Sequence, residues 1–284
     1  MMNICIVGMG LIGGSLSKAM RGNGFAGKII GVDKNPQHCT IAMYCGLASE
    51  FLPLEEAIDA SDLILLCSPV DVNVKLLPEI LDKIKGTSKV VADMGSTKAD
   101  LAAVVKNHEG RGRYVAAHPM AGTEFSGPAA AIENLFYDKV AIICDKEKSD
   151  EDAYLLVMAM LQSLSMRIQY MNSADHDVHV AYVSHISHIT SFALALCVLD
   201  KEKNEKNILS LAAGGFESTV RLAKSNCDTW TPIFLGNSAS ILEVIDTYIE
   251  KMNAFKKSIA ENDHESLRAL MEQANTIRKI LKQP

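Results

Sequence analysis

The chain has 284 residues, of which 48% are hydrophobic and 22% are charged. This length favours two domains, and this composition excludes a disordered or collagen-like protein. The 28 basic and 34 acidic residues give a formal net charge of −6, and the absence of a basic run argues against nucleic-acid or membrane-surface partners. The 7 cysteines are scattered and never spaced as CxxC, and no signal peptide or apolar run of about 18 residues is evident. We therefore expect a reduced, cytoplasmic protein.

The first half of the chain alternates short apolar runs with amphipathic stretches. Runs that are mostly rich in Val and Ile predict strands at 4–7, 28–32, 63–67, 89–94, 114–117 and 139–144. The stretches between them predict helices at 11–21, 37–45, 72–84 and 98–107. Nearly continuous apolar strands that alternate with helices are typical of a parallel sheet buried on both faces. The sequence thus predicts an α/β fold with a doubly wound, Rossmann-type sheet.

The rhythm changes after a predicted helix at 152–164 and a last strand at 167–171. From residue 173 onward, apolar residues recur at helical spacing over 174–199, 207–224, 232–261 and 264–282. We therefore expect a Rossmann domain over residues 1–172 and an all-α domain over residues 173–284. The long apolar faces of the second domain predict a homodimer that is built through it.

A glycine-rich motif, GMGLIG, follows the first predicted strand and opens the first predicted helix. In this context the motif indicates a dinucleotide-binding loop, whose glycines permit a tight turn, close approach of a pyrophosphate and close helix packing. The unpaired N–H groups of the helix then face the phosphates. The predicted cofactor-binding residues of this loop are Gly8, Gly10, Leu11, Ile12 and Gly13.

An acidic residue at the end of the second strand completes this motif. Asp33 lies 20 positions after Gly13, where a carboxylate accepts hydrogen bonds from the adenosine ribose and repels a 2′-phosphate. We therefore expect NAD rather than NADP as the cofactor, although the neighbouring Lys34 leaves the strictness of this preference open. Ser68 and Pro69, after the predicted strand 63–67, form either a nicotinamide-side loop or simply a helix start.

Two polar segments follow later strands, at the edge of the sheet where ligands bind. DMGSTK occupies residues 93–98, and HPMAGTE occupies residues 118–124. His118 is suited to act as a general base because the imidazole pKa lies close to neutrality. A lone histidine is more often a buried structural side chain, but the Pro- and Gly-containing loop after His118 favours a functional role.

The helical half contains further candidate residues. His185 and His188 share a helix face, as do His176 and His179, but the absence of an HExxH pattern and of companion ligands predicts no metal site. Arg221 follows a Gly-Gly pair and is interpreted either as a carboxylate clamp or as a surface ion pair.

Together these motifs resemble the prephenate/arogenate dehydrogenase family of tyrosine biosynthesis. GMGLIGGS, DMGSTK, HPMAGTEFSG, SHISH and GGFESTVRLAKS, followed by Trp230, occur in the order typical of that family and span both halves. The resemblance implies oxidative decarboxylation of a cyclohexadienyl substrate with hydride transfer to NAD. It also implies that His118 takes the proton of the ring 4-hydroxyl with assistance from Ser96. The substrate-binding residues that it implies are Arg221, His188, Thr123, Glu124 and Trp230.

Two positions depart from the pattern of the family. Ser187 stands where a proline often separates the two histidines, and Ser218 stands where an acidic residue often precedes the arginine by three positions. The second departure leaves open how Glu124 and Arg221 are connected and how access to the site is gated. The sequence also leaves open whether prephenate or arogenate is preferred and whether tyrosine inhibits the enzyme.

The sequence also suggests two other classes of protein. A 3-hydroxyacid-type dehydrogenase also joins a Rossmann domain to a helical domain, but it depends on a lysine in a GxxxK-like pattern, whereas Lys224 here follows Arg221. A non-catalytic dinucleotide-sensing regulator requires a DNA-binding module, for which an acidic chain filled by two domains leaves no place.

Overall fold

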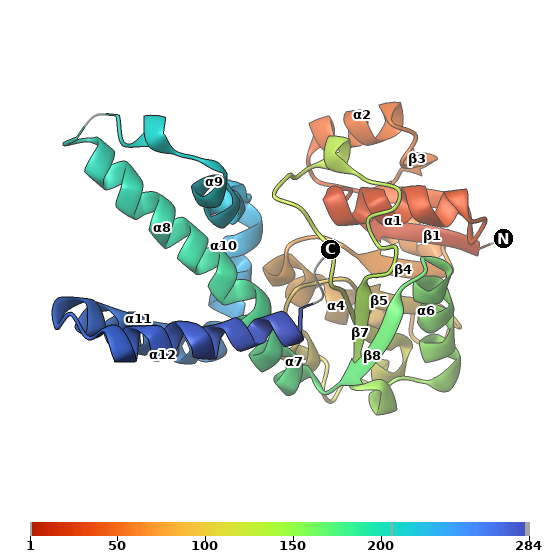
Figure 1. Cartoon of the computed structure of the whole chain (residues 1–284). Coiled ribbons are helices and arrows are strands. Elements are labelled where there is room, and N and C mark those ends of the chain that lie inside the picture. Colours follow the sequence, from red (N-terminus) through yellow and green to blue (C-terminus); the bar gives the residue numbers. More distant parts are fainter. Residues whose placement is uncertain (1, 206, 282–284) are drawn as a thin grey trace. The chain divides into compact units, whose positions relative to one another are not determined.

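A computed structural model describes residues 2–205 and 207–281 and contains one eight-stranded sheet (Figure 1). The strand order is β3-β2-β1-β4-β5-β6-β7-β8. All neighbouring strands are parallel except β6 and β7, which are antiparallel. The strands are β1 (Met2–Val7), β2 (Ala26–Val32), β3 (Glu50–Phe51), β4 (Leu63–Leu66), β5 (Val90–Asp93), β6 (Tyr114–Pro119), β7 (Val140–Cys144) and β8 (Arg167–Met171).

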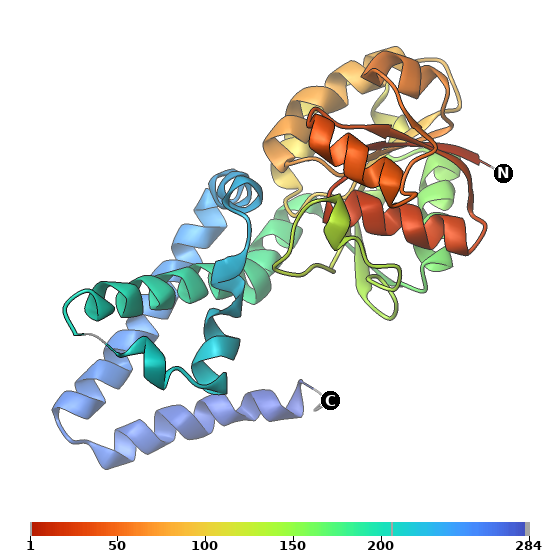
Figure 2. The ribbon, with the colours of Figure 1, turned by 90° about the horizontal axis from the view of Figure 1, so that it is seen from above.

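Helices cover both faces of the sheet (Figure 2). Successive strand residues alternate between the faces, so that Ile4 and Ile6 enter one apolar core while Cys5 and Val7 enter the other. The first core is closed by α1 (Leu11–Gly22), α2 (Pro36–Tyr44) and α6 (Glu151–Ser163). The second core is closed by α3 (Leu54–Asp59), α4 (Val70–Lys83) and α5 (Ala99–Val104).

This architecture confirms the predicted doubly wound α/β fold followed by helices. The sequence does not predict β3 or α3, because two strand residues and six helical residues are too short to show a periodic pattern. The antiparallel β7 is also not anticipated. Its apolar sequence is compatible with either direction, because both faces of the strand are covered.

From Ser173 onward the described structure is helical. The helices are α7 (Ser173–Val180), α8 (Ile186–Glu202), α9 (Gly214–Val220), α10 (Cys227–Gly236), α11 (Ser238–Ala260) and α12 (His264–Asn275). A π-helical turn, Ala181–His185, interrupts the predicted stretch 174–199, and Asn237 divides the predicted stretch 232–261. The predicted stretch 264–282 ends at Lys282, which lies outside the described residues.

The chain forms two compact units, Met1–Ser238 and Ala239–Pro284. The first unit contains the sheet together with α7–α10. The second unit consists of α11, from its second residue onward, and α12. The expected domain boundary near residue 172 coincides with the end of β8 but not with the division into these two units, so it stays a prediction.

One helical run in the described part of the chain is long and apolar enough to span a membrane by length and composition alone. It covers Ser173–Glu202 through the π-helical turn, with a mean hydropathy of 1.5 over 18 residues, of which 11% are buried. The expectation that the sequence holds no such apolar run is therefore wrong. Its exposed apolar side chains are Val178, Val183, Leu194, Leu196 and Leu199.

Candidate active site

The glycine motif forms the turn between β1 and α1. Gly8 has a φ of +94°, and a Cβ added there would lie 2.6 Å from the backbone nitrogen of Ser68. A Cβ on Gly13 would lie 2.2 Å from the carbonyl oxygen of Gly8. A Cβ on Gly10, in contrast, would meet no atom within 4 Å. The fold itself therefore requires glycine at positions 8 and 13, while the open space above Gly10 fits a phosphate group close to the backbone.

Asp33 is held against this turn. Its Oδ2 accepts a hydrogen bond from the backbone N–H of Met9 at 3.0 Å, and its Oδ1 accepts one from Asn35 at 2.9 Å. His38 Nδ1 also lies 3.4 Å from Oδ2. The carboxylate thus has a fixed position at the end of β2, beside the turn, as a ribose-binding residue requires.

Ser68 and Pro69 lie after β4, directly opposite Gly8. The Ser68 hydroxyl donates to the side-chain oxygen of the buried Asn73, and Asn73 Nδ2 donates to the Ser68 carbonyl at 3.0 Å. Pro69 immediately precedes α4. The segment therefore starts a helix and also borders the glycine turn, and its role on the nicotinamide side stays a prediction.

The segment after β5 contains a buried ion pair. The Lys98 ammonium and the Asp93 carboxylate are both fully buried and hydrogen-bonded to each other. Asp93 also accepts the hydroxyl of Tyr114 at 2.6 Å and the backbone N–H of Gly95 at 2.9 Å. These bonds satisfy the buried charges and fix the loop that contains the half-buried Ser96.

His118 lies near the end of β6 and is 8% exposed. Its Nδ1 lies 2.8 Å from Nε2 of His176 on α7, and not against Ser96. His176 Nδ1 in turn lies 2.7 Å from Oδ1 of Asp177. Burial, followed by the nearby His176, Lys98 and His185, lowers the pKa of His118 well below its usual value. His118 is therefore a neutral imidazole at pH 7, the form that accepts a proton.

Arg221 and Glu124 are paired directly. Arg221 Nη1 donates to Glu124 Oε2 at 2.8 Å, which joins the turn after α9 to the loop after β6. Thr123 lies beside Glu124 in this loop, where its hydroxyl accepts the N–H of Phe125 at 3.2 Å. Ser218 donates to the Gly215 carbonyl at 3.0 Å instead of contacting Arg221. The pairing of Glu124 with Arg221 therefore needs no acidic residue at position 218.

Trp230 lies against both histidines of the SHISH motif. Its indole stacks on the His188 ring with centroids 3.4 Å apart, and it meets the His185 ring edge-on at 6.0 Å. His185 is almost fully buried, and burial lowers its pKa from 6.5 to about 4. Among residues 2–205 and 207–281, no group of three or more His, Cys, Asp or Glu side chains is arranged to hold a metal ion.

The structure thus places the predicted residues in three groups. Asp33 and Ser68 lie at the glycine turn, His118 and Glu124 lie on and after β6, and the helical half supplies the remaining side chains, Arg221, His188 and Trp230. Asp177 is not among the residues predicted for the site. It stands next to His176 in the sequence, but no sequence pattern connects that pair with β6.

This fold and its glycine turn define a nucleotide-binding protein of the Rossmann type, extended by helices that place histidines and an arginine near the sheet. Residues 16–170 match the family model described as prephenate dehydrogenase, nucleotide-binding domain. Residues 172–273 match the model described as prephenate dehydrogenase, dimerization domain. The chain belongs to the prephenate dehydrogenase family.

Several members of known name are similar over nearly the whole chain. A prephenate dehydrogenase structure from A. aeolicus, solved with hydroxyphenyl propionate and NAD+, is 31% identical, with 99% of each chain covered and a TM-score of 0.87. A Synechocystis arogenate dehydrogenase structure is 26% identical, with 98% of this chain and 99% of that chain covered and a TM-score of 0.75. The Bacillus subtilis prephenate dehydrogenase is 28% identical and covers 93% of this chain and 72% of its own length.

Proposed function

We propose that this protein catalyses the NAD-dependent oxidative decarboxylation of prephenate to 4-hydroxyphenylpyruvate, of arogenate to tyrosine, or of both. Membership in the prephenate dehydrogenase family supports this reaction over that of a 3-hydroxyacid dehydrogenase or a dinucleotide sensor. The similarity to a structure solved with NAD+ and hydroxyphenyl propionate supports the cofactor and an aromatic product. The 7 cysteines are all free, which accords with a cytoplasmic enzyme.

The observation that carries the proposal is the placement of His118 relative to the nucleotide turn. Gly8 follows β1 and His118 lies on β6, with β4 and β5 between them. At roughly 4.8 Å per strand, this separates the two residues by about 14 Å along one edge of the sheet. A dinucleotide that runs along this edge from Gly10 would bring its reactive ring toward the buried imidazole.

Each group then has a defined task. The glycine turn would hold the pyrophosphate, Asp33 the ribose, and Ser68 and Pro69 the nicotinamide side. NAD, when bound, accepts the hydride that leaves C4 of the substrate ring. His118 removes the 4-hydroxyl proton with assistance from Ser96, while the ring carboxylate leaves as CO2 and the ring becomes aromatic. Thr123, Glu124, His188, Trp230 and Arg221 would surround the substrate, with Arg221 binding a carboxylate.

The test is an absorbance assay for NADH with prephenate and arogenate in turn. We expect turnover of at least one substrate, and the ratio of their kcat/KM values gives the preference. His118→Asn should lower kcat by about 10²–10⁴-fold with a similar KM, because general base catalysis contributes that amount. Absence of NADH formation with both substrates would refute the function, and a fully active His118→Asn variant would refute the role of the base.

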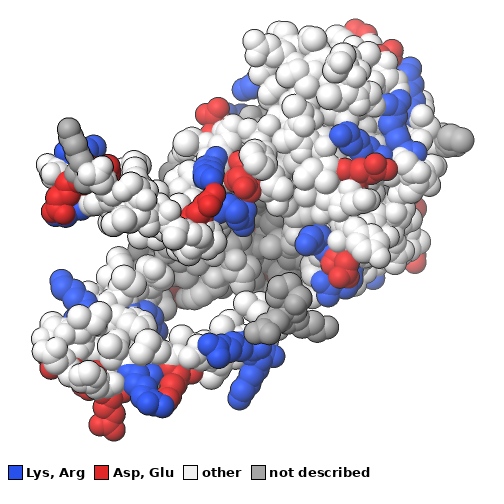
Figure 3. All heavy atoms as spheres, turned by 45° about the horizontal axis from the view of Figure 1, so that its top comes forward, with Lys and Arg blue, Asp and Glu red and all other residues white. Residues whose placement is uncertain are grey.

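We also propose that residues 173–284 form a helical dimerisation and substrate domain and that the enzyme is a homodimer. Each unit exposes large apolar side chains, among them Leu194, Leu196 and Leu199 on α8 and Ile249, at 50% exposure, on α11. Wide parts of the face shown in Figure 3 also carry no charged side chain. A second copy of the matched dimerization domain would bury these side chains.

Light scattering at micromolar concentration tests this assembly. We expect the mass of a dimer for the wild-type chain and a shift toward monomer for Leu196→Glu, because Leu196 on α8 is 60% exposed. Tyr44→Glu on α2 is the matched control, since Tyr44 is 93% exposed and lies far along the sequence from this helix. A monomeric wild-type protein would contradict the proposal.

A further inference from the structure

Three side chains from two distant parts of the sequence form a continuous hydrogen-bonded row. His118 Nδ1 contacts His176 Nε2 at 2.8 Å, and His176 Nδ1 contacts Asp177 Oδ1 at 2.7 Å. His176 is fully buried and Asp177 is 3% exposed, so water does not compete for these bonds. The two imidazole rings meet at 64°, which lets a ring nitrogen of each point at the other.

Asp177 accepts hydrogen bonds from two backbone groups in addition to His176. The N–H of Lys98 donates to Oδ1 and the N–H of Ala99 donates to Oδ2, each at 2.8 Å. Backbone N–H groups can only donate, so both carboxylate oxygens of Asp177 act as acceptors, and Oδ1 is the atom that also faces His176. His176 Nδ1 must therefore be the donor toward Asp177.

This donor assignment fixes the protons along the row. A neutral His176 that is protonated on Nδ1 has a lone pair on Nε2, so His118 Nδ1 must donate to it. A neutral His118 that is protonated on Nδ1 carries its lone pair on Nε2, at the opposite edge of the ring. Burial lowers the pKa of both histidines, which is consistent with two neutral rings in the resting enzyme.

We propose that His176 and Asp177 are positioning residues that hold His118 in the tautomer whose Nε2 accepts the substrate proton. This inference rests on the proposed function of His118. When Nε2 takes the proton from the 4-hydroxyl, the imidazolium still donates through Nδ1 to His176, and the Asp177 carboxylate lies at the far end of the row. The proton stays on His118, and no bond in the row has to break.

The row also links the helical half of the first unit to the sheet. The Asp177 carboxylate accepts the backbone N–H groups of Lys98 and Ala99 at the start of α5. The Asp177 backbone carbonyl accepts a hydrogen bond from Asn237 Nδ2 at 2.7 Å. The same amide lies 3.2 Å from His185 Nδ1, at the end of the π-helical turn. The other charged groups near the row are the buried Lys98 and Asp93, which neutralise each other.

Three variants separate this role from a structural one. Asp177→Ala removes the acceptor of the His176 Nδ1–H, so that His176, and through it His118, loses its fixed orientation and tautomer. His176→Leu removes the acceptor for His118, and His176→Gln retains an acceptor oxygen. We expect the first two to lower kcat by about 10²-fold or more with KM changed less than about threefold, and His176→Gln to recover part of the loss.

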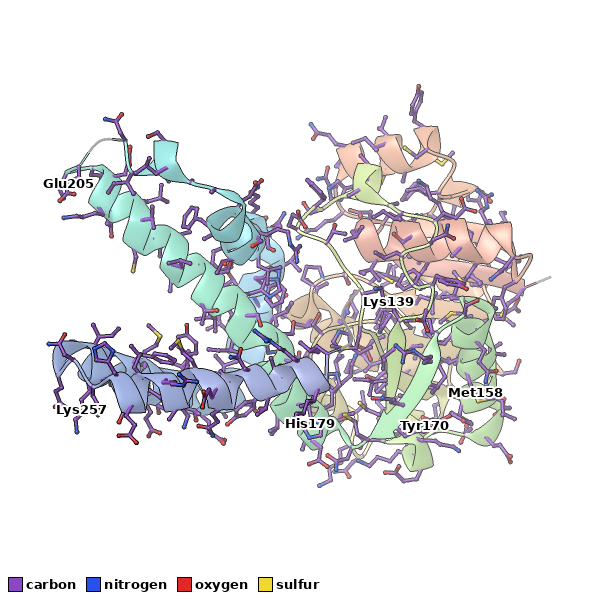
Figure 4. All side chains as sticks on the ribbon, in the orientation of Figure 1. Lys139, Met158, Tyr170, His179, Glu205 and Lys257 are labelled. Atoms are coloured by element: carbon purple, nitrogen blue, oxygen red, sulfur yellow. The ribbon has the colours of Figure 1, made fainter. Side chains whose placement is uncertain are left out.

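Two comparisons make the kinetic test specific. In the background of His118→Asn, His176→Leu should cause almost no further loss, because the row acts only through His118. His179→Leu is the matched control on the same helix, since His179 is exposed on α7 (Figure 4) and should retain the wild-type kcat. An additive loss in the double variant, or wild-type kcat in His176→Leu, would overturn the proposal.

The tautomer can also be read without any activity. In the ¹⁵N-labelled wild-type protein, long-range ¹H–¹⁵N spectra should show His118 protonated on Nδ1 and unprotonated on Nε2 near pH 7.5, with His118→Asn identifying the signal. Asp177→Ala should instead give a mixture of the two His118 tautomers. A wild-type His118 that is protonated on Nε2 would overturn the proposed tautomer even if the enzyme oxidises prephenate. A wild-type protein that oxidises neither substrate would instead overturn the proposed dehydrogenase function.

Discussion

The guanidinium of Arg221 and the carboxylate of Glu124 form a direct ion pair, with Nη1 and Oε2 2.8 Å apart. The arginine that we propose to bind the substrate thus already has an anionic partner. A backbone hydrogen bond, and after it the contact with Arg221, lowers the pKa of Glu124, so this carboxylate is charged at neutral pH. A substrate carboxylate would have to compete with Glu124 for the same guanidinium.

Replacing Arg221 distinguishes a clamp from a surface ion pair. Arg221→Ala should raise the KM for the dienyl substrate by at least ~10-fold, because a charge-assisted hydrogen bond contributes about 1.5–3 kcal/mol. Arg221→Lys should restore only part of this, since an ammonium cannot make two parallel bonds. Separate titrations with substrate and with NAD measure both effects. Equal weakening of both ligands, or of neither, would exclude the clamp.

Replacing Glu124 tests the competition directly. Glu124→Gln removes the negative charge, so the KM for prephenate should fall. The kcat/KM for arogenate divided by the kcat/KM for prephenate should fall as well. The physical reason is that the carboxylate repels the anionic groups of both substrates but attracts the ammonium of arogenate. Glu217→Gln is the control, because Glu217 pairs with Lys224 at 3.9 Å instead. A parallel rise in both KM values would contradict this reasoning.

Two glycines of the nucleotide turn should respond in opposite ways to alanine. Gly10→Ala should leave the melting temperature nearly unchanged and weaken NAD binding by about 10-fold or more, because its Cβ enters only the space proposed for phosphate. Gly13→Ala should destabilise the protein by about 1–3 kcal/mol, because its Cβ would collide with the Gly8 carbonyl. Calorimetry of unfolding and of NAD binding measures both, and an equal loss of stability in the two variants would be inconsistent with this division.

The charge of Asp33 should decide between the two dinucleotides. Asp33→Ser should reduce the preference for NAD over NADP, because a 2′-phosphate would no longer meet a carboxylate. It should also lower stability somewhat, since Met9 loses an acceptor. Asp62→Ser is the matched control, because Asp62 accepts the N–H of Asn3 at the other end of β1. If NADP supports wild-type turnover as efficiently as NAD, the assignment of Asp33 is wrong.

Acid should destabilise the protein through His185. Burial lowers its pKa to about 4 in the folded state, whereas the unfolded chain binds the proton near pH 6.5. The unfolded state therefore binds more protons between these values, so this contribution to stability is complete above about pH 6.5 and is lost as the pH falls toward 4. Between pH 6.5 and 5, His185 alone should cost about 2 kcal/mol.

Urea unfolding at a series of pH values measures this loss. His185→Gln should show a shallower decline of the free energy of unfolding with acid than the wild type. His179→Gln, at the exposed position on α7, should decline as steeply as the wild type. Identical slopes for His185→Gln and the wild type would show that His185 does not titrate in this way.

The sequence alone determined the class of fold and the nucleotide turn. Apolar runs such as 63–67 and the helical spacing of apolar residues from residue 173 onward are local patterns. They indicate the type of each element because a strand or a helix must bury its apolar side chains in any packed structure. The same holds for Gly13, whose Cβ would meet the Gly8 carbonyl within the same turn, and for the positive φ of Gly8. The order of motifs also sufficed to indicate the family, because each motif is contiguous in the chain.

Only the tertiary structure decided what His118 contacts. Its partner His176 lies 58 positions away, and the carboxylate behind it belongs to a helix whose sequence pattern indicates only which side is apolar. The direct pairing of Arg221 with Glu124 spans 97 positions in the same way. Such contacts depend on how the loops and helices pack against the edge of the sheet. The free energy that stabilises this packing comes from the burial of many residues together, and the spacing of residues within one segment does not reveal it.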